Sequence, residues 1–292
     1  MALSSGQRLR QAIRDGILQI PGAPNALMAR LIEQHGFDAI YLSGAAFSAG
    51  HLAIPDIGLF SLTELAQQTA ILAESTVLPV IVDADTGFGD TVNVERTIVE
   101  LERSGAAAIQ LEDQELPKRC GHLSGKQLVS SEEMCRKLRA AVAARRDPDL
   151  VLIARTDARG VHELDTAIQR AREYVEAGAD WIFPEALASA EEFKAFAEAI
   201  DVPLLANMTE FGKSPLLTSE ELESSGYAAV IYPVTLLRVA MKAAEAALGI
   251  LAVDGTQREL LDLMQTRQEL YDLLEYDDYQ ERDRKHFGDE LE

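Results

Sequence analysis

The 292-residue chain is long enough for one large α/β barrel or for two smaller domains, and its hydrophobic fraction of 47% indicates a well-packed core. Its 48 acidic and 27 basic residues give a net charge of -21, which argues against binding to nucleic acid or to an anionic membrane. We expect a cytoplasmic protein, because the sequence has no signal-peptide run and no apolar stretch of membrane-spanning length.

Short apolar runs, each followed by a helical pattern, recur along the chain. We predict eight strands, near residues 18–21, 39–42, 79–82, 107–111, 150–154, 181–183, 203–206 and 228–232. Amphipathic segments lie between them, at residues 25–35, 61–74, 93–104, 130–145, 164–177, 189–199 and 218–223. Continuous apolar strands that alternate with helices indicate a parallel sheet covered by helices. Eight such units predict a (β/α)8 TIM-type barrel.

Glycines support the boundaries of these units. Gly36, Gly105, Gly178 and Gly226 each follow a helical pattern and precede a strand, where a helix commonly ends in a residue with positive φ. The competing fold is an open doubly wound sheet, which normally carries a glycine-rich fingerprint after its first strand. The residues after the first predicted strand lack that fingerprint, so the barrel is favoured.

The C-terminal region adds helices that a bare barrel does not need. We predict a single domain over residues 1–292, with a barrel core at about 8–250 and a helical extension with an acidic tail at 251–292. Helical patterns at residues 235–248 and 259–274 are rich in apolar residues. A surplus apolar helix must cover something, so we expect it to pack on a neighbouring subunit or across its own barrel.

Polar residues end nearly every predicted strand, at the edge where barrels of this kind carry their active sites. Two carboxylates, Asp83 and Asp85, follow the third strand two residues apart, and Glu112 ends the fourth. Oxygen ligands without a neighbouring His or Cys suit Mg²⁺ that keeps several waters. The alternative is that one aspartate caps the next helix and the other pairs with an arginine.

A thiol surrounded by basic residues follows the fourth strand. Lys118, Arg119 and His122 flank Cys120 within five residues, and positive charge lowers the pKa of a thiol, which prepares it for proton transfer. The alternative is a basic surface loop with an incidental cysteine. We expect both cysteines to be free thiols, with Cys135 in the core.

Other strand-end residues suit the binding of carboxylates. Arg155 and Arg238 can each grip a planar carboxylate with paired hydrogen bonds, although arginines at such positions also form structural salt bridges. Ser43 and Gly44 can offer backbone N–H groups to an anion, although a Ser-Gly turn is the simpler explanation.

Seven motifs together resemble one known family. They are KRCGH at residues 118–122, VDADTGFG at 82–89, QLEDQ at 110–114, ARTDA at 154–158, FPEA at 183–186, NMTEFGK at 207–213 and IYPVT at 231–235. The combination resembles the isocitrate lyase and phosphoenolpyruvate mutase superfamily over residues 8–279. This resemblance implies a (β/α)8 barrel whose last helix is exchanged between the subunits of a homotetramer, built as a dimer of dimers.

The resemblance also implies an activity, that of an Mg²⁺-dependent carbon-carbon lyase of propionate catabolism in the methylcitrate cycle. The members that the chain resembles most cleave 2-methylisocitrate to pyruvate and succinate by a retro-aldol-type reaction. An apolar trio, Phe183, Ile231 and Pro233, replaces more polar or bulkier residues of the isocitrate lyases. Such a lining favours an added methyl group by about 1 to 3 kcal/mol.

Residue roles follow from the same resemblance. Asp83 and Asp85 are implied to bind Mg²⁺, with Glu112 supporting it through water. Substrate contacts are implied for Ser43, Gly44, Ala45, Cys120, Gly121, Arg155, Glu185, Asn207, Thr209, Arg238 and Arg267. In this reaction Cys120 is the expected general acid, assisted by Lys118, Arg119 and His122, on a loop at 117–126 that closes over the substrate. For the base we name Tyr41, as a tyrosinate.

Three alternative functions remain at this point. The first is cleavage of a related acid, such as 2,3-dimethylmalate or isocitrate. The second, decarboxylation of oxaloacetate, is disfavoured because it does not need the cysteine loop. The third belongs to a different class, a non-catalytic interaction scaffold, which the concentration of charge at the strand ends argues against.

Overall fold

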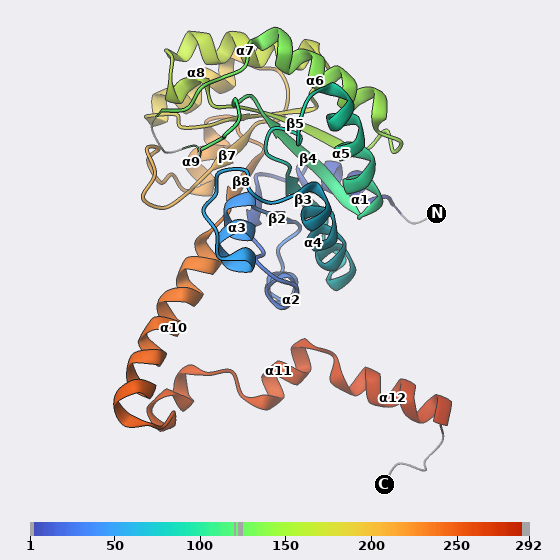
Figure 1. The fold of residues 1–292 in the computed structure, drawn as a ribbon, viewed down its shortest axis with the longest axis vertical. Coiled ribbons are helices and arrows are strands. Elements are labelled where there is room, and N and C mark those ends of the chain that lie inside the picture. Colours follow the sequence, from blue (N-terminus) through green and yellow to red (C-terminus); the bar gives the residue numbers. More distant parts are fainter. Residues whose placement is uncertain (1–2, 120, 122–124, 288–292) are drawn as a thin grey trace. The chain divides into compact units, whose positions relative to one another are not determined.

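The computed structural model describes residues 3–119, 121 and 125–287. The chain divides into two compact units, Met1–Leu237 and Arg238–Glu292, of which the first carries the sheet (Figure 1). Within the described residues eight strands are present. They are β1 Leu18–Pro21, β2 Ile40–Leu42, β3 Val80–Asp83, β4 Ala106–Glu112, β5 Val151–Thr156, β6 Trp181–Pro184, β7 Leu205–Asn207 and β8 Ala229–Tyr232.

All these strands are parallel and close into a barrel. One hydrogen-bonded sheet has the order β1-β8-β7 and the other β2-β3-β4-β5-β6. Isolated parallel bridges join the two at both seams, between Gly22 and Tyr41 and between Ile182 and Leu204. Neighbours in the sheet are neighbours in sequence, except that β8 pairs with β1 and closes the ring, as expected for a (β/α)8 barrel. The fold predicted from the apolar runs is confirmed.

The helices of the first unit surround this barrel. They are α1 Ser5–Ala12, α2 Ala26–Gln34, α3 Gly44–Leu52, α4 Leu62–Ser75, α5 Thr91–Arg103, α6 Ser131–Ala144, α7 Leu164–Glu176, α8 Ala190–Ala199 and α9 Ser219–Ser224, with a short 3₁₀ helix η1 at Ala158–Gly160. The sequence pattern did not predict α1 and α3. Both begin at a serine N-cap, Ser4 and Ser43, which is a local signal for a helix start.

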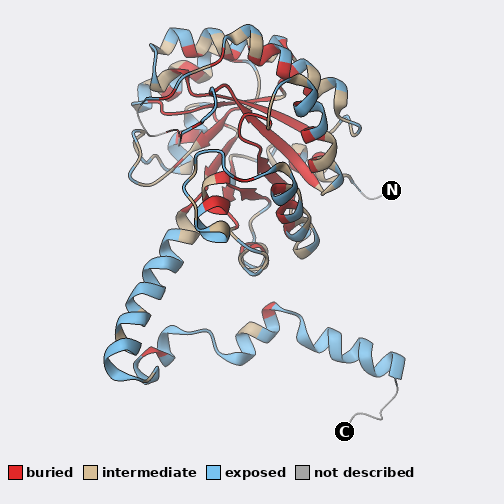
Figure 2. Ribbon diagram, viewed as in Figure 1, coloured by how far each residue is buried: buried red, intermediate tan, exposed pale blue. Residues whose placement is uncertain are grey.

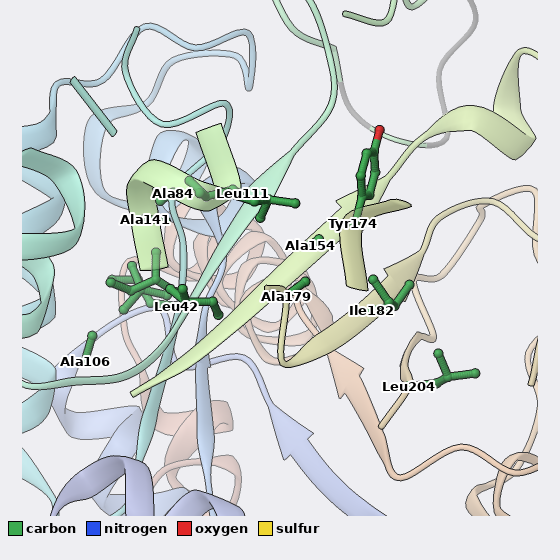
Figure 3. Close-up of a cluster of buried hydrophobic side chains, with 14 of the residues drawn as sticks. Leu42, Ala84, Ala106, Leu111, Ala141, Ala154, Tyr174, Ala179, Ile182 and Leu204 are labelled. Atoms are coloured by element: carbon green, nitrogen blue, oxygen red, sulfur yellow. The ribbon is translucent and has the colours of Figure 1, made fainter. Parts of the chain in front are cut away.

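The core has two layers, because the strands are buried on both faces (Figure 2). Between the sheet and the helices, apolar side chains such as Leu42, Leu111 and Ile182 pack together (Figure 3). Inside the barrel, a second cluster includes Ile20 and Phe183. Burial on both faces explains why the strands read as continuous apolar runs in the sequence.

The predicted glycine helix ends are confirmed. Gly36, Gly105, Gly178 and Gly226 have φ angles of +78°, +94°, +104° and +97°. Glycine adopts this left-handed conformation without the steric cost that a Cβ atom imposes. Each glycine therefore turns the chain from a helix into the next strand.

The second unit continues α10, Thr235–Asp254, into η2 Arg258–Leu263, α11 Arg267–Leu273 and α12 Tyr276–Phe287. The boundary predicted near residue 250, between the barrel core and the helical extension, lies within α10. The acidic tail, whose order the sequence left open, forms α12 over its described part. Most of this unit is exposed, including apolar side chains such as Leu248 and Leu263. None of the described helices is both long and apolar enough to cross a membrane.

Candidate active site

Two carboxylates meet at the carboxyl end of β3. A Cβ atom built at Gly44 would lie 3.2 Å from Asp83 Oδ2 and 3.2 Å from Asp85 Oδ1, so both side chains converge on this glycine. The Gly44 N–H donates to Asp83 Oδ2 over 3.2 Å. Asp85 has a left-handed backbone with φ of +47°, a conformation that costs on the order of 1 kcal/mol and is typical of functional sites.

A hydrogen-bond chain orients this pair from inside the barrel. The Tyr41 hydroxyl donates to Gln110 Oε1 over 2.6 Å, and Gln110 Nε2 donates to Asp83 Oδ1 over 3.0 Å. Burial raises the pKa of Tyr41 well above its ordinary value, and the charge of Asp83 adds to this. These surroundings disfavour the tyrosinate that was predicted as the base, and a base role for Tyr41 stays a prediction. Tyr41 orients Gln110, a residue to which the sequence assigned no role.

Lys118, predicted to assist the cysteine, lies against the aspartates. Its buried ammonium forms ion pairs with Asp56 and with Asp85 Oδ1, the latter over 2.7 Å. Burial opposes its charge, but the surrounding carboxylates outweigh this and raise the pKa of Lys118 well above its ordinary value. For Asp85, burial raises the pKa to about 7 despite the Lys118 charge. Lys118 is therefore a permanent cation beside the carboxylate pair.

The carboxylates fit a divalent metal ion that keeps most of its water. Glu112 Oε1 is buried without a hydrogen-bond partner among the described residues, and burial raises the pKa of Glu112 well above its ordinary value. Across residues 3–119, 121 and 125–287, no three His, Cys, Asp or Glu side chains converge closely enough to hold a metal by themselves. Protein ligands would thus be Asp83 and Asp85, with Glu112 reached through water, as Mg²⁺ sites permit.

Arg155 is surrounded by carboxylates. Its Nε and Nη2 atoms donate to both oxygens of Asp157 over 2.9 and 3.1 Å. Two further carboxylates, Glu112 and Glu185, lie 3.4 Å from the guanidinium, which stands over the Phe183 ring at 5.1 Å. Their charges outweigh burial and raise the pKa of Arg155. Arg155 therefore forms the structural salt bridges that the sequence left open as an alternative, while its binding of substrate stays a prediction.

Three predicted substrate residues form a chain beside Arg155. Asn207 Nδ2 donates to Glu185 Oε2 over 3.1 Å, and the Thr209 hydroxyl donates to Asn207 Oδ1 over 2.6 Å. Glu185 is 1% exposed, while Asn207 and Thr209 are half-buried. These residues come from the ends of β6 and β7, and the barrel brings them together, while their contact with substrate stays a prediction.

A second buried network, which the sequence did not reveal, supports this arginine. Asp113 Oδ2 accepts from the hydroxyls of Thr156 and Tyr174 over 2.8 and 2.7 Å. Its Oδ1 accepts from the Asp157 N–H over 2.9 Å. Asp113 and Asp157 lie two and three residues after the predicted strand ends and directly after β4 and β5, so their position was visible in the sequence, whereas their partners on distant elements were not.

Several predicted residues are placed differently or lie elsewhere. Cys120 and His122 are outside the described residues. The Arg119 side chain is exposed, while its backbone pairs with the Gln114 side chain. Arg238 and Arg267 belong to the second unit, so their substrate contacts stay predictions.

The Ser43 hydroxyl caps α3 by accepting from the Ala46 N–H. The Gly44 N–H is directed to Asp83 rather than left for a substrate anion. Ala45 lies in the first turn of α3. Of the apolar trio, Phe183 and Ile231 belong to the inner core of the barrel, and Pro233 is buried just after β8.

The comparison with known proteins decides to which family the chain belongs. The family model described as phosphoenolpyruvate phosphomutase matches residues 9–251. The chain belongs to this family. Its members include the isocitrate-lyase-like enzymes that the seven motifs resemble, so the family predicted from the sequence is confirmed.

Relatives within the phosphoenolpyruvate phosphomutase family match nearly the whole chain. A 2-methylisocitrate lyase of Aeropyrum pernix is 54% identical over 279 residues, covering 95% of this chain and 90% of the relative. A 2-methylisocitrate lyase of Bacillus subtilis is 52% identical over 268 residues, covering 92% and 88%.

Solved structures of this family show the same fold. The crystal structure of a 2,3-dimethylmalate lyase matches with a TM-score of 0.92 at 34% identity, covering 100% of this chain and 98% of the other. A phosphonopyruvate hydrolase in complex with oxalate and Mg²⁺ matches with a TM-score of 0.86 at 32% identity, covering 98% and 99%.

Proposed function

We propose that the chain is a carbon-carbon lyase that cleaves 2-methylisocitrate to pyruvate and succinate. The observation that carries this proposal is the 54% identity, over 95% of the chain, to a 2-methylisocitrate lyase. The buried carboxylates and the arginine at the carboxyl ends of the strands supply a site for a metal and an acidic substrate.

The side chains of the first unit divide the work of binding. Arg155, held in one orientation by Asp157, presents a fixed positive charge to a substrate carboxylate. Glu185, which lies 3.4 Å from the same arginine, is joined to Asn207 by a hydrogen bond, and the two can position further substrate oxygens. Side chains that are ordered before binding reduce the entropy lost in reaching the reactive geometry.

The metal fits the carboxylate pair. Asp83 and Asp85 would hold Mg²⁺, with Glu112 bonded through water, and the phosphonopyruvate hydrolase structure contains this ion. A bound Mg²⁺ supplies Lewis-acid stabilisation of negative charge on a substrate oxygen. The Gln110 amide fixes the orientation of Asp83 by its hydrogen bond, and Tyr41 fixes that of Gln110.

Cys120 would serve as the proton donor. Cleavage breaks the bond between the hydroxyl-bearing carbon and its neighbour. The hydroxyl passes its proton to a base, which releases it to solvent, and its oxygen becomes the ketone oxygen of pyruvate. The electron pair stays on the succinate fragment as a carbanion next to a carboxylate. This carbon takes the thiol proton of Cys120, and the resulting thiolate is reprotonated before the next turnover.

The test is direct. The purified chain is incubated with Mg²⁺ and 2-methylisocitrate, and both products are identified by NMR. We expect pyruvate and succinate in equal amounts, and loss of the reaction after removal of the metal with EDTA. Failure to form either product with Mg²⁺ present would overturn the proposal.

A second substrate, 2,3-dimethylmalate, is favoured by the likeness to the 2,3-dimethylmalate lyase structure. The lower identity of 34% against 54% makes it the weaker candidate. Measurement of kcat/KM for 2-methylisocitrate, 2,3-dimethylmalate and isocitrate with the same purified protein ranks these three candidate substrates. We expect 2-methylisocitrate to have the highest value.

We propose further that the chain assembles as a homotetramer in which the last barrel helix is exchanged between subunits. This proposal is supported by the exposed apolar side chains of the second unit, among them Val239, Met241, Leu248 and Leu263. Sedimentation equilibrium should give the mass of four 31.9 kDa chains. A monomer at micromolar concentration would refute this assembly.

A further inference from the structure

Lys126 is a buried lysine on the returning arm of the loop that carries the KRCGH motif. It is 5% exposed. The base of this loop is closed by an antiparallel bridge between Gln114 and Leu128. Backbone hydrogen bonds from Glu115 N to Gln127 O and from Val129 N to Asp113 O support the bridge. The backbone at Lys126 is therefore held in place by its neighbours.

The Lys126 ammonium connects the loop to the end of β5. It donates to the Gly121 carbonyl oxygen over 2.5 Å and to Asp157 Oδ1 over 2.6 Å. Both partners are buried, and Asp157 is 0% exposed. A charge-assisted hydrogen bond shielded from water is stronger than the same bond at the surface.

Asp157 joins this lysine to the arginine of the site. The carboxylate receives Lys126 on Oδ1 and Arg155 on both oxygens. Burial disfavours its charge, but Arg155 and Lys126 outweigh burial and lower the pKa of Asp157 to about 2. One carboxylate thus fixes two cations, one on the loop and one on the barrel.

Gly121 is the part of the motif that lies on the site. A Cβ atom at this position would collide with Arg155 Nη2 and would come within 2.6 Å of Glu185 Cδ. The Gly121 backbone therefore packs directly against these two side chains, with Lys126 holding its carbonyl from the other side. Cys120 is the preceding residue in the chain.

We infer that Lys126 is a positioning residue, which holds the Gly121 backbone against Arg155 and Glu185 by bridging the Gly121 carbonyl to Asp157. This inference rests on the proposed lyase function for its kinetic consequence. Lys126 need not touch the substrate, because it acts through the peptide next to Cys120. Its absence lets that backbone move relative to Arg155, which misplaces the proton donor.

A purely structural role for Lys126 predicts something different. If the ammonium only balanced the charge of Asp157, its loss would lower stability, and folded enzyme would keep its turnover number. If it positions the backbone, kcat falls in folded enzyme while KM changes little, because Arg155 keeps its two hydrogen bonds to Asp157. A fall in kcat without a matching change in KM therefore indicates positioning, and an unchanged kcat in a less stable enzyme indicates a purely structural role.

The experiment compares three variants with the wild-type chain. K126M removes the ammonium at similar length, and we expect kcat to fall on the order of 100-fold with a much smaller change in KM. G160A keeps the charge but adds a Cβ atom 2.8 Å from Lys126 Nζ, so it should lower kcat in the same direction and by less. K194M, at a lysine whose side chain is 67% exposed, should match wild type.

Hydrogen exchange provides a readout that does not depend on the substrate. Amides in a peptide covering residues 115–126 should exchange faster in K126M than in wild type, while those of α6 should exchange at the same rate. If wild-type protein does not cleave 2-methylisocitrate, the proposed function fails and the exchange comparison alone decides the role of Lys126.

Two outcomes would overturn the inference. One is a folded K126M with kcat within about threefold of wild type. The other is unchanged exchange over residues 115–126. If K126M does not fold, the kcat of G160A and its hydrogen exchange over residues 115–126 test the inference instead. G160A should fold, because Gly160 has no positive φ that an alanine would strain.

Discussion

The two ends of the barrel differ in what they offer a ligand. At the amino end, a groove of about 760 Å³ opens between α1, β1 and the loops before β2 and β3. Three of its ionisable residues, Asp15, His35 and Asp38, are exposed. At the carboxyl end, Lys118 and Arg155 are buried and fixed by carboxylates.

The difference lies in the burial of charge rather than in the presence of a groove. Exposed charges interact weakly because water screens them, and their side chains are free to move. Buried charges act strongly on one another and on a ligand, and their partners hold them in one orientation. Variants at the two ends should therefore have very different effects on catalysis.

The largest effect is expected at the cysteine. C120S should lower kcat about 10²- to 10⁴-fold, the usual contribution of a positioned general acid, because a serine hydroxyl is a much weaker acid. Steady-state pyruvate formation measures the loss. C135S is the matched control, since Cys135 is buried in α6 and donates to the Glu173 carbonyl oxygen at 3.4 Å.

Burial also raises the pKa of Cys135, so little of it is thiolate at neutral pH. It should react slowly with iodoacetamide, and C135S should keep its activity. Full turnover in C120S would exclude Cys120 as the proton donor. It would also remove the largest difference in catalytic effect expected between the carboxyl and amino ends of the barrel.

The next effect is expected at Arg155. R155M leaves Asp157, Glu112 and Glu185 without the guanidinium that balances them, and removing one partner of a buried ion pair costs about 3 to 5 kcal/mol. Urea denaturation should show this loss of unfolding free energy, and kcat/KM should fall with it.

The control for R155M is R159M. Arg159 binds Glu192 through two hydrogen bonds at the surface, with side chains 25% and 20% exposed. Ion pairs at the protein surface contribute about 0 to 1 kcal/mol, so this variant, at a partly exposed pair, should lose much less stability than R155M. Equal losses in both variants would mean that burial does not strengthen the charges at the carboxyl end.

A smaller effect is expected at Tyr41. Y41F removes the donor to Gln110 Oε1 and leaves that buried oxygen unpaired, which should lower the free energy of unfolding by about 1 to 3 kcal/mol. Because Tyr41 orients Gln110 rather than accepting the substrate proton, kcat should fall much less than in C120S. A loss of about 10²-fold or more would restore Tyr41 as the base.

The smallest effect is expected at the amino end. H35A and D38A alter exposed side chains of the groove, so kcat/KM should stay within about twofold of wild type. Assays at saturating and subsaturating substrate test both kcat and kcat/KM. A tenfold change would show that the groove is coupled to the site at the opposite end of the barrel.

The sequence predicted the fold well because each strand is buried on both faces and each unit repeats the same apolar pattern. The strand from residue 18 to residue 21 matches β1 without error, and the others differ by one or two residues at their ends. The carboxylates Asp83 and Asp85 were also visible, since their spacing after a strand places them at the active end of a barrel.

What the sequence could not predict depends on contacts between distant elements. The raised pKa of Tyr41, which disfavours the predicted tyrosinate, was not visible, because the neighbouring sequence does not reveal burial beside Asp83. Gln110 and Asp113 acquire their partners only when β4 lies next to β3, β5 and α7.

By itself the sequence therefore determined the repeating unit, the number of strands and which residues stand at their ends, since these follow from local pattern and chain order. The tertiary structure decided which of those residues meet. Closure of the barrel places Lys126 between Gly121 and Asp157, which is 31 residues further along the chain. It also brings Glu112 and Glu185, from the ends of β4 and β6, to Arg155. Low exposure then makes these charges strong, because burial removes the water that would screen them.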